Sequence, residues 1–363
     1  MDPSFNGVGP SPNILNLQHP RGLVFAESAT KSCYDFDMCR PIARLVTLLS
    51  ILLAACAPGL AAPTPQNTPS ATQLPTKTTA PSPTTQPRVQ SIPDLLNLED
   101  VLTIEEYKTG IDGLDAGALA YAITYLSDGY TVEGYISAPI DYLEKEEAYP
   151  VLVYNRGGNA DFGAVNSNMP PNLAISFQAI VLASQYRETR GGNGKDEFGG
   201  ADVRDIIKLI DLVGSCPFID HDHVVMWGES RGSIMTFEIL RVDDRIDAAI
   251  VDGSVPDLVA VYNFRNQDMQ SMLDYRVGGS PEEVPEEYTK RSAIQWADEI
   301  NVPLLVFHTE DDLRAPIEPV DEFVALLQSL GKEVTYIRQA KGGHCWNDLD
   351  KIMDFFAEHT RDG

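Results

Sequence analysis

The chain has 363 residues, of which 27 are Lys or Arg and 53 are Asp or Glu, so its formal net charge is -26 at pH 7. Such a surface repels the phosphates of nucleic acids and argues against nucleic-acid binding. The five cysteines show neither the paired spacing of a metal site nor a disulfide framework. The length is sufficient for one large domain behind an N-terminal quarter whose composition is not globular.

The beginning of the chain reads as a targeting segment. Residues 38–55 carry Arg40 and Arg44 ahead of an apolar run too short for a membrane span, which needs about 20 residues. The run ends in Leu-Ala-Ala before Cys56 and resembles the lipobox of bacterial lipoproteins. This resemblance implies cleavage before Cys56, lipidation of that residue and a membrane-anchored location outside the cytoplasm. An ordinary signal peptide with an incidental cysteine is the alternative.

Two further segments lie outside the expected domain. If residues 38–55 are the signal, residues 1–37 are expected to be a disordered or non-native extension, as a misplaced start codon would produce. Residues 56–91 are rich in Pro, Thr, Ser, Ala and Gln and hold too few large apolar residues to build a core. They predict an extended tether. We therefore expect the globular domain over residues 92–363.

The rest of the sequence alternates between strand and helix patterns. Two β-rich runs flank Ser127-Asp128-Gly129 and predict an antiparallel hairpin over residues 118–138. Further strands are predicted at 149–154, 179–185, 224–227, 248–251, 302–307 and 334–337. Helices are predicted at 170–178, 203–212, 234–240, 317–330 and 346–359, with mixed helix and loop over 256–300. This alternation predicts an α/β protein with a doubly wound, mostly parallel sheet.

One strand-to-helix junction carries a chemical pattern. The apolar run 224–227 is followed by Gly228-Glu229-Ser230-Arg231-Gly232, which has the form G-x-S-x-G, and then by a helical pattern. A strand that turns sharply into a helix holds its turn residue in a strained conformation, and flanking glycines relieve the crowding. The junction predicts the nucleophile elbow of an α/β-hydrolase fold, with Ser230 as nucleophile. The alternative is a glycine-rich turn with a helix-capping serine.

A serine nucleophile needs a base to take its proton and a third group to orient that base. In this fold the chain order is serine, acid, histidine. His344 follows the last predicted strand and is the expected base. His308 is expected to be a structural histidine at a strand end, and His359 a solvated one.

The acid is expected in the loop after the 302–307 strand, because loops at the carboxyl ends of parallel strands present the site. The candidates are Glu310, Asp311 and Asp312, with Asp321 further on. Spacing alone does not separate Asp311 from Asp312.

An oxyanion hole requires two preorganised N–H donors. The backbone N–H of Arg231, directly after the nucleophile, is the first candidate. The second is expected in the turn Arg156-Gly157-Gly158, where glycines let the backbone approach the reacting carbonyl closely.

Taken together, residues 154–163, the loop 186–202, the elbow and residues 308–314 resemble the catalytic domain of the prolyl oligopeptidase family of serine peptidases. The resemblance covers the chain from about residue 118 onward. The family's D-x-R pattern matches Asp312-Leu313-Arg314 and implies Asp312 as the acid. Some members place an oxyanion-binding tyrosine at the position of Arg156; because this chain departs there, we expect the backbone N–H to serve instead.

Many members carry a β-propeller before the catalytic domain. The roughly sixty residues between Pro93 and Tyr154 are too few for blades of about forty residues each, so no propeller is expected here. The resemblance implies a peptidase that acts on short peptides and needs no metal or cofactor. An esterase that acts on small acyl esters with the same triad is the alternative. A non-catalytic binding lipoprotein is disfavoured because all three triad members are present. The sequence does not indicate an oligomeric state.

Three other signals receive structural interpretations. His221-Asp222-His223 is expected to be a surface turn before a strand rather than a metal site. Cys345 is expected to be a small buried hydrophobe. Residues 259–275 could cap the site but are expected to pack as core through their large side chains: Tyr262, Phe264, Met269, Met272 and Tyr275.

Overall fold

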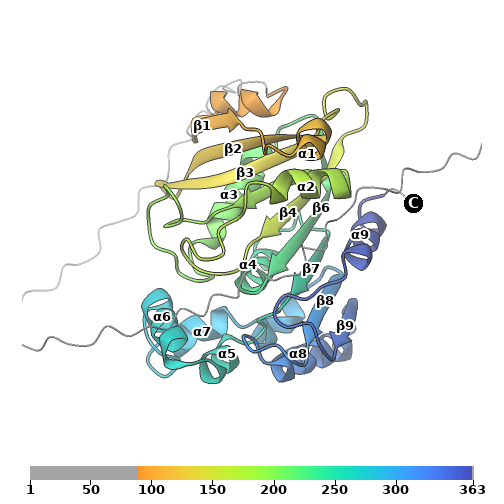
Figure 1. Ribbon diagram of the computed structural model, residues 1–363. Helices are drawn as coiled ribbons and strands as arrows, with labels where there is room; N and C mark the ends of the chain where they lie inside the picture. Colours follow the sequence, from red (N-terminus) through yellow and green to blue (C-terminus); the bar gives the residue numbers. More distant parts are fainter. Residues whose placement is uncertain (1–88, 362–363) are drawn as a thin grey trace, which may run out of the picture. The chain divides into compact units, whose positions relative to one another are not determined.

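The computed structural model describes residues 89–361, and the strands of this part form one sheet (Figure 1). The strand order is β1-β2-β3-β5-β4-β6-β7-β8-β9. The pairs β1–β2, β2–β3 and β3–β5 are antiparallel, and the other pairs are parallel. From β1 to β9 the strands are Val101–Glu106, Ala118–Ser127, Tyr130–Pro139, Tyr149–Asn155, Ile180–Ser184, Ile219–Glu229, Ala248–Asp252, Leu304–Thr309 and Val334–Gln339. The predicted mostly parallel sheet is confirmed.

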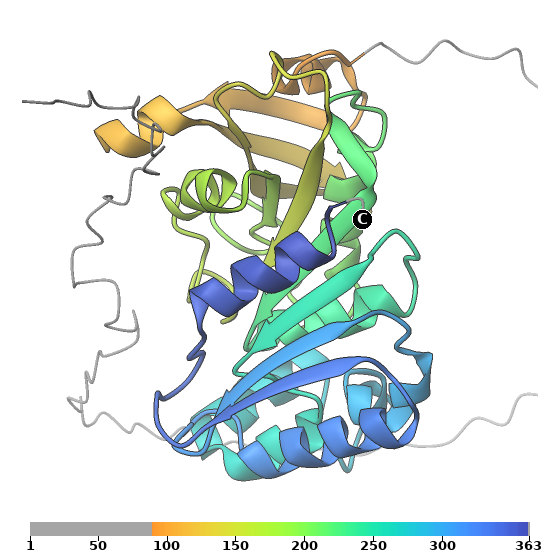
Figure 2. The same ribbon diagram turned by 90° about the vertical axis from the view of Figure 1, so that its right-hand side faces the viewer.

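Helices cover both faces of the sheet. Helices α2 (Met169–Phe177) and α9 (Leu349–Glu358) pack together on one face, where the ring centroids of Phe177 and Phe356 are 5.1 Å apart. Figure 2 shows α9, in dark blue, crossing this face. The other face is covered by α3 (Val203–Val213), α4 (Arg231–Leu240) and α8 (Ile317–Ser329). The remaining described helices are α1 (Asp112–Gly117), α5 (Leu258–Phe264), α6 (Gln267–Val277), α7 (Pro285–Lys290) and the 3-10 helices η1 (Ile92–Asn97) and η2 (Ala293–Glu299).

The second half of strand β6 shows why strand segments covered on both faces are apolar at every position. Val224 and Met226 point into the core under α3, α4 and α8, whereas Val225 and Trp227 point into the core under α2 and α9. Because successive side chains of a strand face opposite sides, a strand covered on both faces must be apolar throughout. The apolar run 224–227 therefore indicates a central strand, and this strand leads directly into the elbow.

The predicted hairpin is confirmed as β2 and β3, with Ser127 paired to Tyr130. Asp128 and Gly129 both have positive φ, 52° and 80°. Two consecutive residues of positive φ match the right-handed twist of the flanking strands and make a two-residue turn favourable.

Several predicted boundaries differ from the structure. Strand β1 and helix α1 were not predicted; β1 is an edge strand whose side chains are mostly exposed, so its sequence lacks a buried stripe. Strand β6 begins at Ile219 and pairs there with the start of β4, so the turn predicted for residues 221–223 is wrong. Helix α9 begins at Leu349 rather than at residue 346, because the Asp348 carboxylate caps it by accepting the Lys351 N–H at 3.4 Å.

The region of α5 and α6 is only partly core. Tyr262, Met269 and Met272 pack against a small apolar cluster, as expected. Phe264 and Tyr275 are 46% and 63% exposed, so the core prediction is wrong for these two.

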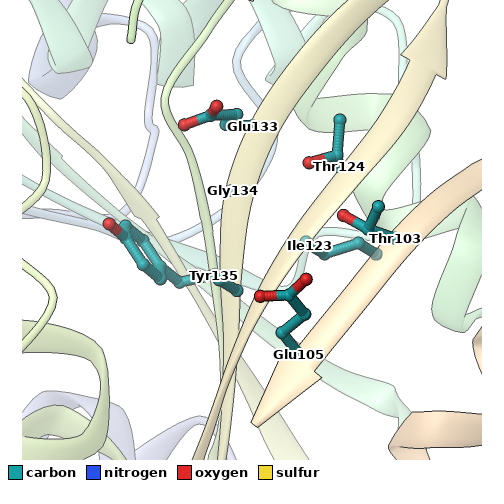
Figure 3. A pocket seen from close by; sticks show the side chains of 8 residues that line it. Thr103, Glu105, Ile123, Thr124, Glu133, Gly134 and Tyr135 are labelled. Atoms are coloured by element: carbon teal, nitrogen blue, oxygen red, sulfur yellow. The ribbon is translucent and has the colours of Figure 1, made fainter. Parts of the chain in front are cut away.

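A polar groove of ≈ 270 Å³ lies across β1, β2 and β3 (Figure 3). Its side chains share one face because Thr103 pairs with Thr124, and Thr124 pairs with Glu133. Glu105 and Tyr135 line it further along the strands. The residues predicted to form the active site do not line this groove.

The predicted signal segment, Cys56 and most of the tether lie outside the described residues. Within residues 89–361, no helix combines the length and apolar character that a membrane crossing demands.

Candidate active site

Ser230 occupies the junction between β6 and α4 with φ 53° and ψ -119°. A non-glycine residue with positive φ outside the left-handed helical region is strained and is held there by its surroundings. A Cβ at Gly228 would lie 2.5 Å from the Gly232 carbonyl oxygen, and one at Gly232 would overlap the Asn155 carbonyl. Both glycines are therefore required for the sharp turn, for the predicted reason. The Ser230 hydroxyl makes no helix-capping hydrogen bond, which excludes the capping interpretation.

The structure brings the three predicted triad residues into one chain of contacts. The His344 Nε2 lies 2.8 Å from the Ser230 Oγ, and its Nδ1 lies 2.8 Å from the Asp312 Oδ2. The three residues follow β6, β8 and β9, so they meet at the carboxyl ends of parallel strands. When Nδ1–H donates to Asp312, the lone pair of Nε2 is directed at the serine hydroxyl. This is the arrangement in which His344 can accept the proton of Ser230.

Asp312 is held as a carboxylate although it is buried. Burial alone would raise its pKa, but the hydrogen bond to His344 and the N–H groups of Arg314 and Ala315 keep the pKa below its ordinary value. Those two N–H groups donate to Oδ1 at 2.7 and 3.0 Å, which leaves Oδ2 for the imidazole. The negative charge therefore faces the base.

The other acid candidates have different partners. Asp311 accepts the N–H groups of Gly342 and Gly343 on Oδ1, at 2.9 and 2.8 Å. The Thr309 hydroxyl donates to the Gly343 carbonyl at 2.9 Å. Asp311 thus holds the backbone that carries His344, whereas Asp312 contacts the His344 ring. Sequence spacing could not distinguish these two tasks.

The remaining acid candidates stand apart from the imidazole. Glu310 and Asp321 both pair with Arg338 on the exposed side of β9.

The other histidines serve the fold. The His308 ring is buried, its Nε2 lies 3.0 Å from the Ala315 carbonyl oxygen, and burial lowers its pKa. This agrees with the expected structural role. His359 ends α9 and packs against the Phe355 ring at 4.4 Å, so it is less solvated than expected.

The predicted oxyanion turn lies against the nucleophile. A Cβ added to Gly157 would be 3.2 Å from the Ser230 Cβ and 3.1 Å from the Glu229 carbonyl oxygen. Arg231 is the first residue of α4, where backbone N–H groups have no partner within the helix. Within residues 89–361, neither the Gly157 N–H nor the Arg231 N–H donates to another group of the protein. Gly157 contacts Ser230 and Arg231 follows it in the chain, so both N–H groups meet the requirements of the oxyanion interpretation.

The Arg156 side chain points away from this position. Its guanidinium is buried and donates to the carbonyl oxygens of Gly157, Ala160 and Gln185 at 2.9, 3.0 and 2.6 Å. The side chain therefore supports the loop, and only the backbone at this turn can reach the reacting carbonyl.

A buried polar network under the His344 loop was not foreseen. The Tyr154 hydroxyl donates to Glu229 at 2.6 Å, and Trp227 and Asn347 donate to Asp252 at 3.1 and 2.8 Å. Burial raises the pKa of both carboxyl groups, and for Asp252 the charge of Glu229, its partner across β6 and β7, raises it further. In the sequence the only signal is an acidic residue at the end of each strand.

Cys345 lies beside this network, where its Sγ is 4.0 Å from the Asp252 carbonyl oxygen. The residue is half-buried rather than fully buried as expected. Desolvation raises the pKa of its thiol, which keeps it protonated.

A doubly wound sheet with this elbow and this Ser-His-Asp chain defines a serine hydrolase of the α/β-hydrolase fold. Residues 186–362 match the model of the prolyl oligopeptidase family. The chain is 31% identical over 202 residues to the uncharacterized peptidase YtmA of Bacillus subtilis, covering 54% of this chain and 75% of YtmA. It is 26% identical over 228 residues to the uncharacterized peptidase YuxL of the same organism, covering 60% and 34% of the two chains.

Among solved structures, the acylaminoacyl peptidase of Pyrococcus horikoshii superposes with a TM-score of 0.60 at 22% identity, covering 71% of this chain and 44% of that one. The chain spans less than half the length of this protein and of YuxL. The superposition on the acylaminoacyl peptidase confirms the fold expected from the sequence. The chain belongs to the prolyl oligopeptidase family of serine peptidases.

Proposed function

We propose that this chain hydrolyses peptide bonds of short peptides through an acyl-enzyme on Ser230. The observation that carries the proposal is the contact chain Asp312–His344–Ser230, with 2.8 Å at each step. The names of the relatives, two of them peptidases and one an acylaminoacyl peptidase, support a peptide substrate.

In the acylation step the Ser230 Oγ attacks the carbonyl carbon while His344 Nε2 takes its proton. The carbonyl oxygen becomes negative and is stabilised by the N–H groups of Arg231 and Gly157. The tetrahedral intermediate then loses the amine as the C–N bond breaks and His344 returns the proton to the nitrogen. Asp312 keeps the imidazole oriented and stabilises the imidazolium.

In deacylation a water molecule attacks the ester carbon of the acyl-enzyme. His344 takes a proton from this water and gives it to the Ser230 Oγ when the bond between the acyl group and the serine breaks. The enzyme returns to its starting state, and every proton is accounted for within the triad and the two products.

An esterase would use the same residues, so substrate tests decide between the two activities. The full chain would be assayed with peptide anilides, including ones with proline before the bond, and with p-nitrophenyl acyl esters. Cleavage of anilides that is lost in Ser230→Ala and kept in Ser329→Ala, an exposed serine of α8, supports the peptidase. Turnover of esters alone assigns the chain to the esterases. Anilide and ester cleavage that survive in Ser230→Ala would refute the site.

We further propose that the chain is held at a membrane outside the cytoplasm by a lipid on Cys56. The support is the positive and apolar pattern of residues 38–55 and the cysteine that follows it. Bacteria that express the full chain would be fed an alkyne-tagged fatty acid. Label that enters the native chain and is lost in Cys56→Ser supports the anchor, whereas unlabelled chain in both strains refutes it.

A further inference from the structure

Two arginines lie over one tyrosine ring next to the predicted oxyanion turn. The Tyr186 ring is fully buried, and the guanidinium carbons of Arg156 and Arg231 lie 4.7 and 4.8 Å from its centroid. Cations over an aromatic face are attracted by the electron density of the ring, most strongly where water is excluded. We call this group the Arg156–Tyr186–Arg231 stack. Its members come from the ends of β4, β5 and β6, so it joins three neighbouring strands at the site.

The tyrosine hydroxyl contacts the backbone of the oxyanion turn. It donates to the Arg156 carbonyl oxygen at 3.1 Å. This carbonyl shares its peptide plane with the Gly157 N–H, and in a planar trans peptide the C=O and N–H point in opposite directions. A donor that fixes the carbonyl on the interior side therefore fixes the Gly157 N–H on the side of the nucleophile.

The two guanidiniums hold the following peptides in the same way. Arg156 Nη1 donates to the Gly157 carbonyl at 2.9 Å, and Arg231 Nη1 donates to the Gly158 carbonyl at 3.1 Å. Arg231 Nη1 also donates to Asp196, which accepts the Ala160 N–H at 2.9 Å. The carbonyl groups of Arg156, Gly157 and Gly158 are thus each held by a hydrogen-bond donor. Arg231, whose backbone N–H is one proposed oxyanion donor, also holds the loop that carries the other donor.

Charge within the stack is balanced by buried acids. Arg231 pairs with both Asp196 and Asp202, whereas Arg156 has only neutral acceptors. Burial and the neighbouring Arg231 lower the pKa of Arg156 to about 10. Arg156 is still protonated at neutral pH, so the turn is held by two cations and by one neutral hydroxyl that can be removed without disturbing the charges.

We propose that Tyr186 is a positioning residue that aims the Gly157 N–H at the developing oxyanion. This inference rests on the proposed function, because it takes the Gly157 N–H as an oxyanion donor. It requires no group outside the protein, and its effect is confined to steps in which negative charge develops on the substrate oxygen.

The test is Tyr186→Phe, which removes the hydroxyl and keeps the ring in the stack. Tyr288→Phe is the matched control, because Tyr288 is equally buried and donates to the Gly279 carbonyl at 3.2 Å on another part of the fold. The first measurement is the rate at which a fluorophosphonate labels Ser230 in the full chain, since this needs the nucleophile and the oxyanion site but no knowledge of the natural substrate. The endpoint of labelling counts folded sites and corrects for partly folded preparations.

We expect Tyr186→Phe to be labelled about 10-fold more slowly, below the roughly 100- to 1,000-fold cost of losing an oxyanion donor outright. With an acyl substrate, kcat falls by a similar factor while KM changes little, and binding of a peptide aldehyde weakens in parallel. Tyr288→Phe should change neither the labelling rate nor kcat. Equal labelling of the two variants, or a raised KM with unchanged kcat, overturns the positioning role. If Ser230 is labelled but peptides are not cleaved, the proposed substrate fails while the labelling rates still decide the role of Tyr186.

Discussion

The two sides of Ser230 are built from opposite kinds of side chain. On the side of the base, carboxylates accept hydrogen bonds: Asp312 from the imidazole and Asp311 from the loop that carries it. On the oxyanion side, the guanidiniums of Arg156 and Arg231 donate to loop carbonyls. The first side must stabilise an imidazolium and the second an oxyanion. The loop that carries His344 is therefore held by negative groups, and the oxyanion turn by positive groups. In each case the sign is opposite to that of the charge that develops during the reaction.

The largest effect should come from the acid that touches the base. In Asp312→Asn the amide can donate to Nδ1 and favour the wrong tautomer, so kcat should fall about 10,000-fold. Asp321→Asn, which loses only contacts to Arg338 and Tyr336, should stay near the parent rate. Steady-state kinetics on one substrate measures kcat for both variants. A loss below tenfold in Asp312→Asn would contradict the proposed role of Asp312 in orienting His344.

A smaller loss should follow from releasing the loop that carries the base. Asp311→Ala removes the acceptor of two N–H groups, so His344 is less well placed and kcat should fall on the order of 10- to 100-fold. Asp311→Asn keeps a carbonyl oxygen and should recover most of the rate. If the alanine and asparagine variants are equally impaired, the charge of Asp311 matters rather than its hydrogen bonds.

The smallest effect should come from the buried acid network. The pKa of Glu229 is raised in the folded state, so this carboxyl binds its proton more tightly there than in the unfolded chain. Its ionisation therefore makes folding less favourable as pH rises through the ordinary range of a glutamate and beyond. Glu229→Gln keeps an acceptor for the Tyr154 hydroxyl and has no ionisable group at this position. The difference in free energy of unfolding between variant and parent should therefore favour the variant more at pH 8 than at pH 4. Urea unfolding at both pH values measures this, and exposed Glu322→Gln should show no such pH dependence.

The elbow could be predicted from the sequence because its causes are local. Two glycines, a serine and an apolar strand stand within ten residues, and the clashes that demand the glycines occur within the same turn and its neighbouring strand. His344 could be predicted from chain order. Asp312 required the family resemblance, because Asp311 has the same side chain and differs only in its direction.

The supporting groups could not be predicted because their partners are distant in the chain. Tyr186 meets Arg156 across 30 positions and Tyr154 meets Glu229 across 75, and nothing in the local pattern marks either contact. Strand β1 was missed for another reason. An edge strand with mostly exposed side chains carries little hydrophobic periodicity, and periodicity is the main signal by which a strand is found.

The close packing of Gly232 against Asn155 limits how this protein can evolve. Any side chain at residue 232 would displace the end of β4, so the elbow cannot be varied to accommodate new substrates. Substitutions should cost less where side chains are exposed, as at Phe162 after the oxyanion turn, Phe264 at the end of α5 and Leu313 beside the acid. Changes in substrate preference within this lineage should therefore accumulate in these loops while the elbow stays constant.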